Sequence, residues 1–532
     1  MPTLTKLEPE APSSSYAQPE REGSGANESW RGLALAAVVI GCILRLAEYL
    51  LNRSLWMDEA YLSLNLLHRS FVGLLSPLDY HQGAPIGFLL LEKLAVRWWG
   101  GSEYSLRLVP LLAGIVSLIF FYKLSARILP QRAVPIAVGL MAISPTMIYY
   151  SAEVKQYSTE AAIAVLLYWL MVEGSQWEWG PIQSVSAALL GAIAIWMSHS
   201  SVFILAGIGV TVSVSLFLRK DWSRLLRVLS VGTCWMASLV LCYLVTLRKL
   251  SGDNELLSYW KTNFMPLPPR SVTDLKWFID SFFEFFGTSA GWKFTGLAAL
   301  VFLVGVLVTY RKSRERVFVL LIPALFTLLA SGLHKYPFGG RLTLFLVPAV
   351  LLFVAEGVEF LRSSVSTRLP SAGAVLVALV FLDPAVYALH HFAKPHTEVV
   401  QPGVMRSEEI RPVLGYVRTN EQAGDLVYIF YGAEPAFDYY AERDHWSSGN
   451  VEIGTASGND PHPYESDLDR LRGHRVWVVI SHIRGVGGQD AKFVDFYLSQ
   501  LGPRLITFTA AGAEADLYDL SKASAPPQSQ QH

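Results

Sequence analysis

Long apolar stretches separated by short polar loops fill the chain from residue 30 to residue 392. An apolar stretch of about 20 residues is long enough to cross a bilayer core of roughly 30 Å as a helix. We count about eleven such stretches, of which 159–172 is the shortest. They are 30–51, 105–124, 134–149, 159–172, 182–197, 201–218, 228–247, 293–310, 317–333, 342–361 and 372–389. The pattern predicts a polytopic α-helical membrane protein with about 11 transmembrane helices.

The last quarter of the chain has a different pattern. Residues 398–520 alternate short apolar runs with regular polar positions, which indicates a soluble domain. The runs predict helices at 407–418, 434–441 and 490–501, and strands at 425–431, 475–480 and 504–509. Strands that alternate with helices are typical of an α/β layer. Since no glycine-rich phosphate loop of recognised spacing occurs there, we expect a recognition or packing domain rather than a second active site.

Both ends of the chain are polar. Residues 1–29 are rich in Pro, Ser, Glu and Gly and lack the basic start and cleavage site of a signal peptide, so we expect a disordered cytoplasmic tail. Residues 521–532 are predicted to be a second disordered tail. Between them, 30–392 forms the predicted membrane domain, with long extracytoplasmic loops at 52–104 and 248–292.

Composition supports the membrane class. Hydrophobic residues make up 52% of the chain and charged residues 16%, with a mean hydropathy of +0.35. Soluble domains typically carry about 25% charged residues. The net charge of -1 marks no nucleic-acid-binding surface, so we expect membrane lipids and no nucleic acid among the partners. The three cysteines all lie inside apolar stretches, which favours buried hydrophobic positions over disulfides or metal ligands.

The distribution of Lys and Arg predicts the orientation, because these residues stay on the cytoplasmic side of span ends. With the N-terminus inside, the basic clusters of alternate loops all fall inside, and only Arg248 and Lys249 run against the rule. An odd number of spans then leaves the C-terminal domain extracytoplasmic. The basic residues that fall inside are Lys123, Arg127, Arg132, Arg219, Lys220, Arg224, Arg227, Arg311, Lys312, Arg314, Arg316, Arg362 and Arg368.

Two adjacent carboxylates, Asp58 and Glu59, follow directly after the first span. Ionisable groups beside a span are costly and are candidates for function. The alternative is that they cap an interfacial helix as first-turn acids. Further polar candidates fall on the same predicted face of the membrane: His81, Glu103, Arg107, Glu153, Lys155, Tyr157, His199, Lys335, Tyr336 and Arg341.

Each candidate also has a structural explanation. A single loop histidine such as His81 is usually just solvated, and Tyr336 suits an interfacial aromatic belt. Glu103 and Arg107 are spaced by four, so we expect them to form a helical ion pair that orients the second span. Lys155 can extend to lipid headgroups. Because all of these residues gather on one face next to carboxylates, an active site is favoured.

Such a site suits an anionic, lipid-linked substrate. Lys155, Arg341 and Lys335 would compensate phosphate charge, and a carboxylate would act as the base that deprotonates an acceptor hydroxyl. A sugar linked through phosphate brings its own leaving group. Glu153 would align the acceptor, shift a neighbour's pKa or bind a divalent cation, and a metal held by Asp58 and Glu153 stays an open alternative.

Several motifs together resemble the GT-C class of integral-membrane glycosyltransferases, in particular the bacterial branch related to protein O-mannosyltransferases, the aminoarabinose transferase of lipid A and the RgtA/B/C/D-like enzymes. The resemblance covers residues 31–359. Its motifs are the D-E motif at 55–61, the E-x-x-x-R-L-P-like motif at 101–110, Ser144-Pro145 followed by the second-loop motif at 151–157, and Arg341 with Pro348.

The resemblance implies a role for each matched residue. Asp58 would be the catalytic base, Glu59 a supporting carboxylate and Glu153 a second-loop acid that orients substrate or metal. Lys155 would contact the donor phosphate, and the family implies inversion at the anomeric carbon. Two positions differ from the family: the usual H-P-P-L turn is His81-Gln82-Gly83-Ala84, and Lys155 replaces the usual Arg and so lacks its bidentate fork. His81, Tyr157, Arg107, His199, Tyr336 and Arg341 complete the expected substrate-binding set.

The sequence therefore predicts a glycosyltransferase of a bacterial inner membrane that moves a hexose or pentose from a polyprenyl-phosphate donor to a lipid, glycan or protein on the extracytoplasmic face. One alternative is a transporter or lipid-glycan flippase that uses the same carboxylates as ion sites. Against it, the acids lie at loop level and no inverted repeat of interrupted spans occurs. A second alternative is a receptor or scaffold that acts through its C-terminal domain.

Overall fold

The computed structural model describes residues 24–174, 180–250, 252–366, 370–395, 402–404, 407–446, 450–455, 462–482 and 487–523. The first helix, α1 (Ser24–Leu50), begins ahead of the predicted start at Trp30, so residues 24–29 are helical rather than disordered. The other residues of the two predicted tails lie outside the described ranges, except for the turn at 521–523.

Helices coincide with all of the predicted apolar stretches. Eight are long and apolar enough to cross a membrane, and a bent pair brings the number to nine within the described part of the chain. The predicted total of about eleven spans also includes α8, which carries two acids, and α9, which is apolar but shorter. The helices besides α1 are α5 (Leu108–Ile128), α6 (Val134–Ile143), α7 (Pro145–Tyr149), α8 (Tyr157–Gly174), α9 (Pro181–Met197), α10 (Ser201–Leu218), α11 (Trp222–Cys242), α15 (Thr295–Lys312), α16 (Arg314–Gly332), α17 (Val347–Ser366) and α18 (Pro370–Ala393).

The bent pair, α6 and α7, sets the position of the second loop. Pro145 follows Ser144, and the chain turns by 56° at this break, which leaves the last carbonyls of α6 without helical partners. The guanidinium of Arg45 on α1 is fully buried and donates to the carbonyls of Met141 (3.1 Å) and Ala142 (3.2 Å). A break inside a membrane domain is tolerated where other groups satisfy the freed backbone in this way.

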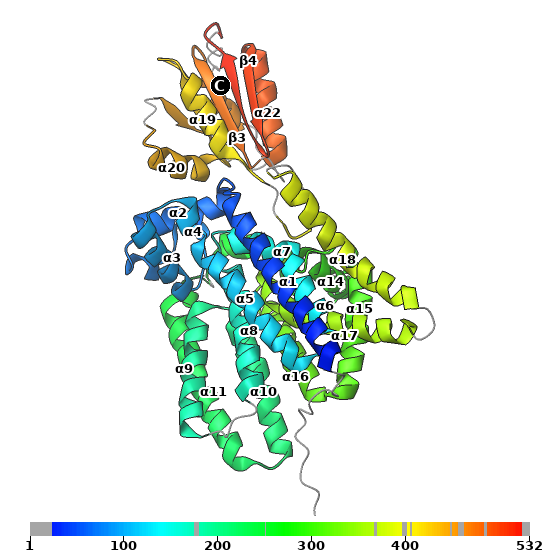
Figure 1. Cartoon of the computed structure of the whole chain (residues 1–532). Helices are drawn as coiled ribbons and strands as arrows, with labels where there is room; N and C mark the ends of the chain where they lie inside the picture. Colours follow the sequence, from blue (N-terminus) through cyan, green and yellow to red (C-terminus); the bar gives the residue numbers. More distant parts are fainter. Residues whose placement is uncertain are drawn as a thin grey trace, which may run out of the picture.

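Short helices form a layer between the membrane helices and the C-terminal domain (Figure 1). The first long loop contains α2 (Met57–His68), α3 (Ile86–Trp99) and α4 (Glu103–Leu106). The second long loop contains α12 (Arg248–Leu250), α13 (Asn254–Tyr259) and α14 (Val272–Glu284). The 3-10 helix η7 (Gly340–Leu346) precedes α17 and carries Arg341.

The C-terminal domain is an α/β layer, as predicted. Its five-stranded sheet has the order β2-β1-β3-β5-β4, with β1 to β3 parallel and β5 antiparallel to both neighbours. The sequence did not predict β2, α21 or β5. The elements are α19 (Ile410–Asn420), β1 (Leu426–Ile429), α20 (Glu434–Arg443), β2 (Val451–Ile453), α21 (His462–Asp469), β3 (Arg475–Ser481), α22 (Gly487–Leu501), β4 (Arg504–Ala510) and β5 (Ala513–Asp519).

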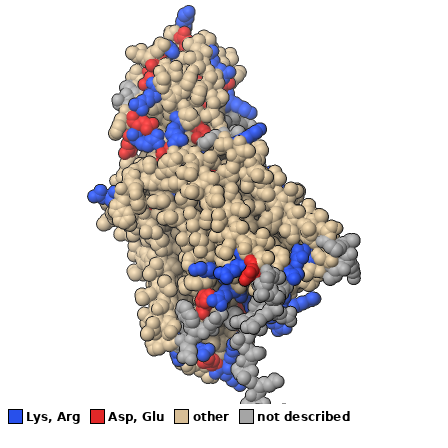
Figure 2. All heavy atoms as spheres, in the orientation of Figure 1, with Lys and Arg blue, Asp and Glu red and all other residues tan. Residues whose placement is uncertain are grey.

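Charged side chains gather at the two ends of the molecule. Figure 2 shows them on the C-terminal domain and at the opposite end, with a broad zone nearly free of Lys, Arg, Asp and Glu between them on this face. The helices that are long and apolar enough to cross a membrane run through this zone (Figure 1). The chain is thus a multi-pass membrane protein. Its C-terminal domain packs on α2 through α20, where His68 of α2 and Glu442 of α20 lie 2.6 Å apart.

Candidate active site

Asp58 and Glu59 are the second and third residues of α2, in the first turn after the N-cap Trp56. Neighbouring residues of an α-helix project about 100° apart, since 3.6 residues complete a turn. The two carboxylates therefore have different partners. Asp58 meets cations from two other segments of the chain, whereas Glu59 points into the protein.

Glu59 is fully buried and holds the loops together. Its carboxylate accepts hydrogen bonds from Arg107 at 2.9 Å (Nε) and 2.7 Å (Nη2), and its Oε1 also accepts from the amide of Val154 at 2.8 Å. The prediction of an ion pair between Glu103 and Arg107 is wrong. Arg107 ends the short helix α4 with non-helical φ and ψ angles, so the spacing of four does not bring the two side chains together.

Asp58 lies between two cations. Its Oδ1 accepts from Nζ of Lys155 at 2.9 Å, and its Oδ2 is 2.8 Å from Nη2 of Arg341. Burial alone would raise the pKa of this carboxyl, but the charges of Lys155 and Arg341 hold it well below its usual range. Asp58 is therefore ionised at neutral pH, and the second loop and η7 both converge on it.

Aromatic rings surround the guanidinium of Arg341. The rings of Trp56, Tyr157 and Trp260 lie 5.5, 5.6 and 5.9 Å from its carbon Cζ, within the range of cation–π attraction. Nζ of Lys155 also donates to Oε1 of Gln82 at 2.5 Å. Sequence reasoning missed Trp56, Gln82 and Trp260 as site residues, although Trp56 and Gln82 stand beside the motif residues Asp58 and His81.

Glu153 is a fully buried carboxyl beside this cluster. Neither of its oxygens has a hydrogen-bond partner among the described residues. Burial, together with the nearby charge of Glu59, raises the pKa of Glu153 to about 8. A carboxyl that keeps its proton at neutral pH can donate a hydrogen bond to a substrate oxygen.

This buried carboxyl predicts a pH-dependent stability. The folded protein retains the proton of Glu153 up to about pH 8, whereas the unfolded chain releases it near its ordinary pKa of 4.5. The stability that this protonated carboxyl contributes is fully present below pH 4.5 and is lost as the pH rises toward 8. Thermal unfolding in lipid should therefore show a larger fall in Tm between pH 5 and pH 8 for the wild type than for Glu153→Gln. Equal slopes for the two proteins would contradict the assignment.

The other predicted residues have different surroundings. His81 is exposed and pairs with Asp253 at 2.7 Å and Glu255 at 3.0 Å. Hydrogen bonding to Asp253 raises the pKa of His81, so this pair ties the first long loop to the second. His199 is half-buried between α9 and α10, and the side chain of Lys335 is exposed.

Tyr336 supports the segment that carries Arg341. Its hydroxyl donates to the carbonyl of Leu342 at 2.8 Å, and its ring packs edge-on against Phe203, with 5.1 Å between the ring centroids. It therefore fixes η7 rather than facing Asp58. The structure brings Asp58, Lys155, Tyr157 and Arg341 together. Glu153 lies close enough for the charges of Asp58 and Arg341 to affect its pKa.

A divalent cation does not fit beside Asp58 in this arrangement. Both oxygens of the carboxylate already face cations, and a metal ion would meet the charges of Lys155 and Arg341 at close range. Among the described residues there is also no group of three or more His, Cys, Asp and Glu that could hold a metal.

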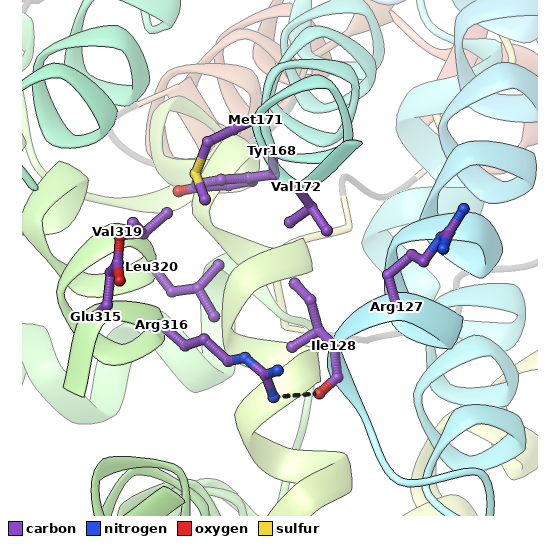
Figure 3. A pocket seen from close by; sticks show the side chains of 9 residues that line it. All are labelled: Arg127, Ile128, Tyr168, Met171, Val172, Glu315, Arg316, Val319 and Leu320. Carbon is purple, nitrogen blue, oxygen red and sulfur yellow. Dashed lines mark hydrogen bonds between the residues drawn. The ribbon is translucent and has the colours of Figure 1, made fainter. Parts of the chain in front are cut away.

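One pocket lies away from this cluster. A pocket with an empty volume of about 400 Å³ opens at the far ends of α5 and α8, and Figure 3 shows Arg127, Tyr168 and Arg316 among the residues that line it. Arg127 lies in the last turn of α5, whereas Arg107 precedes the start of that helix. The pocket is therefore separated from the Asp58 cluster by the length of α5.

Comparison with solved structures defines the fold class. No family profile matches the sequence, and no curated protein matches it. The structure of ArnT from Cupriavidus metallidurans in the apo state is similar to this chain with a TM-score of 0.53 and 13% identity, over 94% of this chain and 100% of that one. ArnT bound to undecaprenyl phosphate gives 0.52, 13%, 94% and 99%.

A second class of enzyme has the same architecture. The Archaeoglobus fulgidus oligosaccharyltransferase, in complex with Zn and sulfate, is similar with a TM-score of 0.51 and 14% identity, over 92% of this chain and 74% of that one. Both neighbours are GT-C glycosyltransferases. The chain therefore has the GT-C fold, as the sequence motifs indicated.

Proposed function

We propose that this protein is a membrane glycosyltransferase that takes a sugar from a polyprenyl-phosphate donor and transfers it to a hydroxyl of a lipid, glycan or protein acceptor. The observation that carries the proposal is the convergence of Lys155 and Arg341 on Asp58, next to the buried carboxyl of Glu153. The GT-C fold and the undecaprenyl phosphate bound by ArnT support this donor class.

The two cations would hold the phosphate of the donor. Lys155 offers a compact charge and Arg341 a planar fork, and both are largely shielded from water. A bound phosphate competes with Asp58 for these cations. As they move to the phosphate, the pKa of Asp58 rises toward its ordinary value, and its carboxylate becomes a better base.

The reaction would then be a single displacement. Asp58 takes the proton of the acceptor hydroxyl while the acceptor oxygen forms a bond to the anomeric carbon. The bond from that carbon to the phosphate oxygen breaks, and polyprenyl phosphate leaves with the electron pair. Because the attack comes from the face opposite the leaving group, the anomeric configuration inverts. Glu153, with its proton in place, would orient a substrate oxygen by donating a hydrogen bond.

The site would lie on the extracytoplasmic face of a bacterial inner membrane. This orientation follows from the basic clusters of alternate loops, such as Arg219 and Lys220 in the turn between α10 and α11. The lower ends of α10 and α11 lie away from the C-terminal domain (Figure 1).

The proposal predicts turnover of polyprenyl-phosphate sugars. Purified protein in liposomes should transfer or hydrolyse at least one hexose or pentose donor from a panel with different sugars. Ion-dependent movement of a lipid-linked sugar across the bilayer, with the donor bond intact, would instead favour a flippase. A failure of every donor to react in the presence of lipid, glycan and peptide acceptors would contradict the proposal.

Loss of one cation should weaken donor binding. A charge-assisted hydrogen bond contributes about 1.5–3 kcal/mol, so Lys155→Met should raise the KM for the donor by roughly 10–100-fold. Lys276→Met is the matched control, because Lys276 is exposed on α14 and pairs with Asp280, so its KM effect should be negligible. An unchanged KM in Lys155→Met would show that Lys155 does not bind the phosphate.

A further inference from the structure

The backbone that leads into Asp58 has no regular secondary structure. α1 ends at Leu50 and α2 begins at Met57, and we call residues 52–55 the α1–α2 linker. Asn52 has a φ of 46°, in the left-handed region that asparagine adopts more readily than most other non-glycine residues. A segment of this kind keeps one conformation only where its surroundings hold its peptide groups.

The C-terminal domain holds one side of the linker. Side chains from α19, from the residue before it and from α20 each bond one peptide group. These hydrogen bonds are Arg411 Nη2 to the Asn52 carbonyl (2.9 Å), the Ser54 amide to Glu409 Oε2 (3.2 Å), and the Leu55 amide to the Tyr440 hydroxyl (2.9 Å). Glu409 and Tyr440 are buried, so water does not replace these partners readily.

The membrane domain holds the other side. Arg107 donates to the carbonyl of Arg53 at 2.7 Å and to that of Ser54 at 3.4 Å. The same guanidinium binds Glu59 in the first turn of α2. The linker is thus fixed between one arginine of the membrane domain and three side chains of the C-terminal domain.

A second contact reaches the residue just before α2. The ring of His482, which follows β3, stacks on the ring of Trp56 with 6.3 Å between centroids. Trp56 in turn lies against Arg341, which binds Asp58. The C-terminal domain therefore contacts both the linker and the aromatic wall of the Asp58 cluster.

We propose that the C-terminal domain is a structural part of the active site, in which Glu409, Arg411 and Tyr440 are positioning residues that fix the α1–α2 linker and thereby aim Asp58. This rests on the proposed function, because it assigns the domain a role in the rate of that reaction. Asp58 is the second residue of α2, so a shift of the linker moves its carboxylate directly. A displacement of about 1 Å at a reacting group can cost roughly 10²-fold in rate.

Two adjacent tyrosines of α20 allow a matched test. The hydroxyl of Tyr440 accepts from the Leu55 amide and donates to Glu103 at 3.2 Å, whereas the hydroxyl of Tyr439 donates to the carbonyl of Gly101 at 2.7 Å, outside the linker. Both rings are buried, and each Phe variant removes one hydroxyl at the domain interface. Only Tyr440→Phe removes a linker contact.

The experiment measures two quantities on the full-length protein in lipid. Amide hydrogen exchange of the peptide that spans residues 52–58 should accelerate in Tyr440→Phe and not in Tyr439→Phe. The kcat for transfer should fall about tenfold in Tyr440→Phe with a much smaller change in the KM for the donor, because the site is misaligned rather than emptied. Tyr439→Phe should keep the wild-type kcat.

Each outcome decides the proposal. Faster exchange and lower kcat in Tyr440→Phe alone support it. Faster exchange with an unchanged kcat, equal exchange in both variants, or an equal loss of kcat in both would overturn it. If the wild type turns over no donor, the proposed function fails on its own, while the exchange measurement still decides whether the domain holds the linker.

Discussion

Asp58→Asn should lower the rate of sugar transfer by about 10²–10⁴-fold, which is the range for loss of a general base. Asparagine has nearly the same shape but accepts no proton from the acceptor. Donor binding should persist or tighten, because Lys155 and Arg341 no longer share their charge with a carboxylate at this position. Single-turnover transfer and equilibrium binding of the donor, both measured in lipid, separate the two effects.

Asp79→Asn is the control for this experiment. Asp79 belongs to the same long loop and pairs with Arg69 at 2.7 Å, but its side chain is 63% exposed. This variant should transfer sugar at the wild-type rate. If Asp58→Asn lost donor binding together with transfer, Asp58 would organise the phosphate site, and the base would have to be another group.

The lengths of the apolar stretches and the spacing of the motifs predicted most of the architecture. Every predicted stretch coincides with a helix because about 20 apolar residues have few alternatives to a buried helix. The alternation of short strands and helices likewise revealed the α/β class of the C-terminal domain. The sequence pattern did not predict the strand β5, because Glu514 and Asp516 interrupt its apolar positions. Asp516 is buried and accepts a hydrogen bond from the hydroxyl of Thr507 on the neighbouring strand β4. The local sequence around Asp516 does not reveal this partner.

The site was predictable only in part, for a related reason. The motifs around Asp58 and Lys155 named the residues that meet, but spacing along the chain does not give partners across loops. Glu103 illustrates this limit. Its carboxylate binds Arg411 at 2.8 Å and Arg443 at 2.6 Å, more than 300 positions away, and leaves Arg107 to Glu59. Contacts of this range arise from docking of the C-terminal domain.

Glu59→Gln should destabilise the protein by about 3–5 kcal/mol, which is the usual cost of removing one partner of a buried ion pair. Arg107 is only 2% exposed and would keep its charge without a compensating carboxylate. The amide of Val154 would also donate to a neutral oxygen instead of to a carboxylate. Thermal unfolding in lipid at pH 7 gives the loss of stability directly, as a large fall in Tm.

Glu103→Gln tests whether the loss of stability depends on burial of the partner arginine. The carboxylate of Glu103 is also buried, but its partners Arg411 and Arg443 are 32% and 30% exposed, so water can solvate them once the charge is gone. Its loss of Tm should be clearly smaller. At a temperature where Glu59→Gln remains folded, its transfer rate should exceed that of Asp58→Asn, because Glu59 faces Arg107 and not the substrate side. A Glu59→Gln protein with wild-type Tm and no transfer would reverse the two roles and make Glu59, rather than Asp58, the acid that takes part in the chemistry.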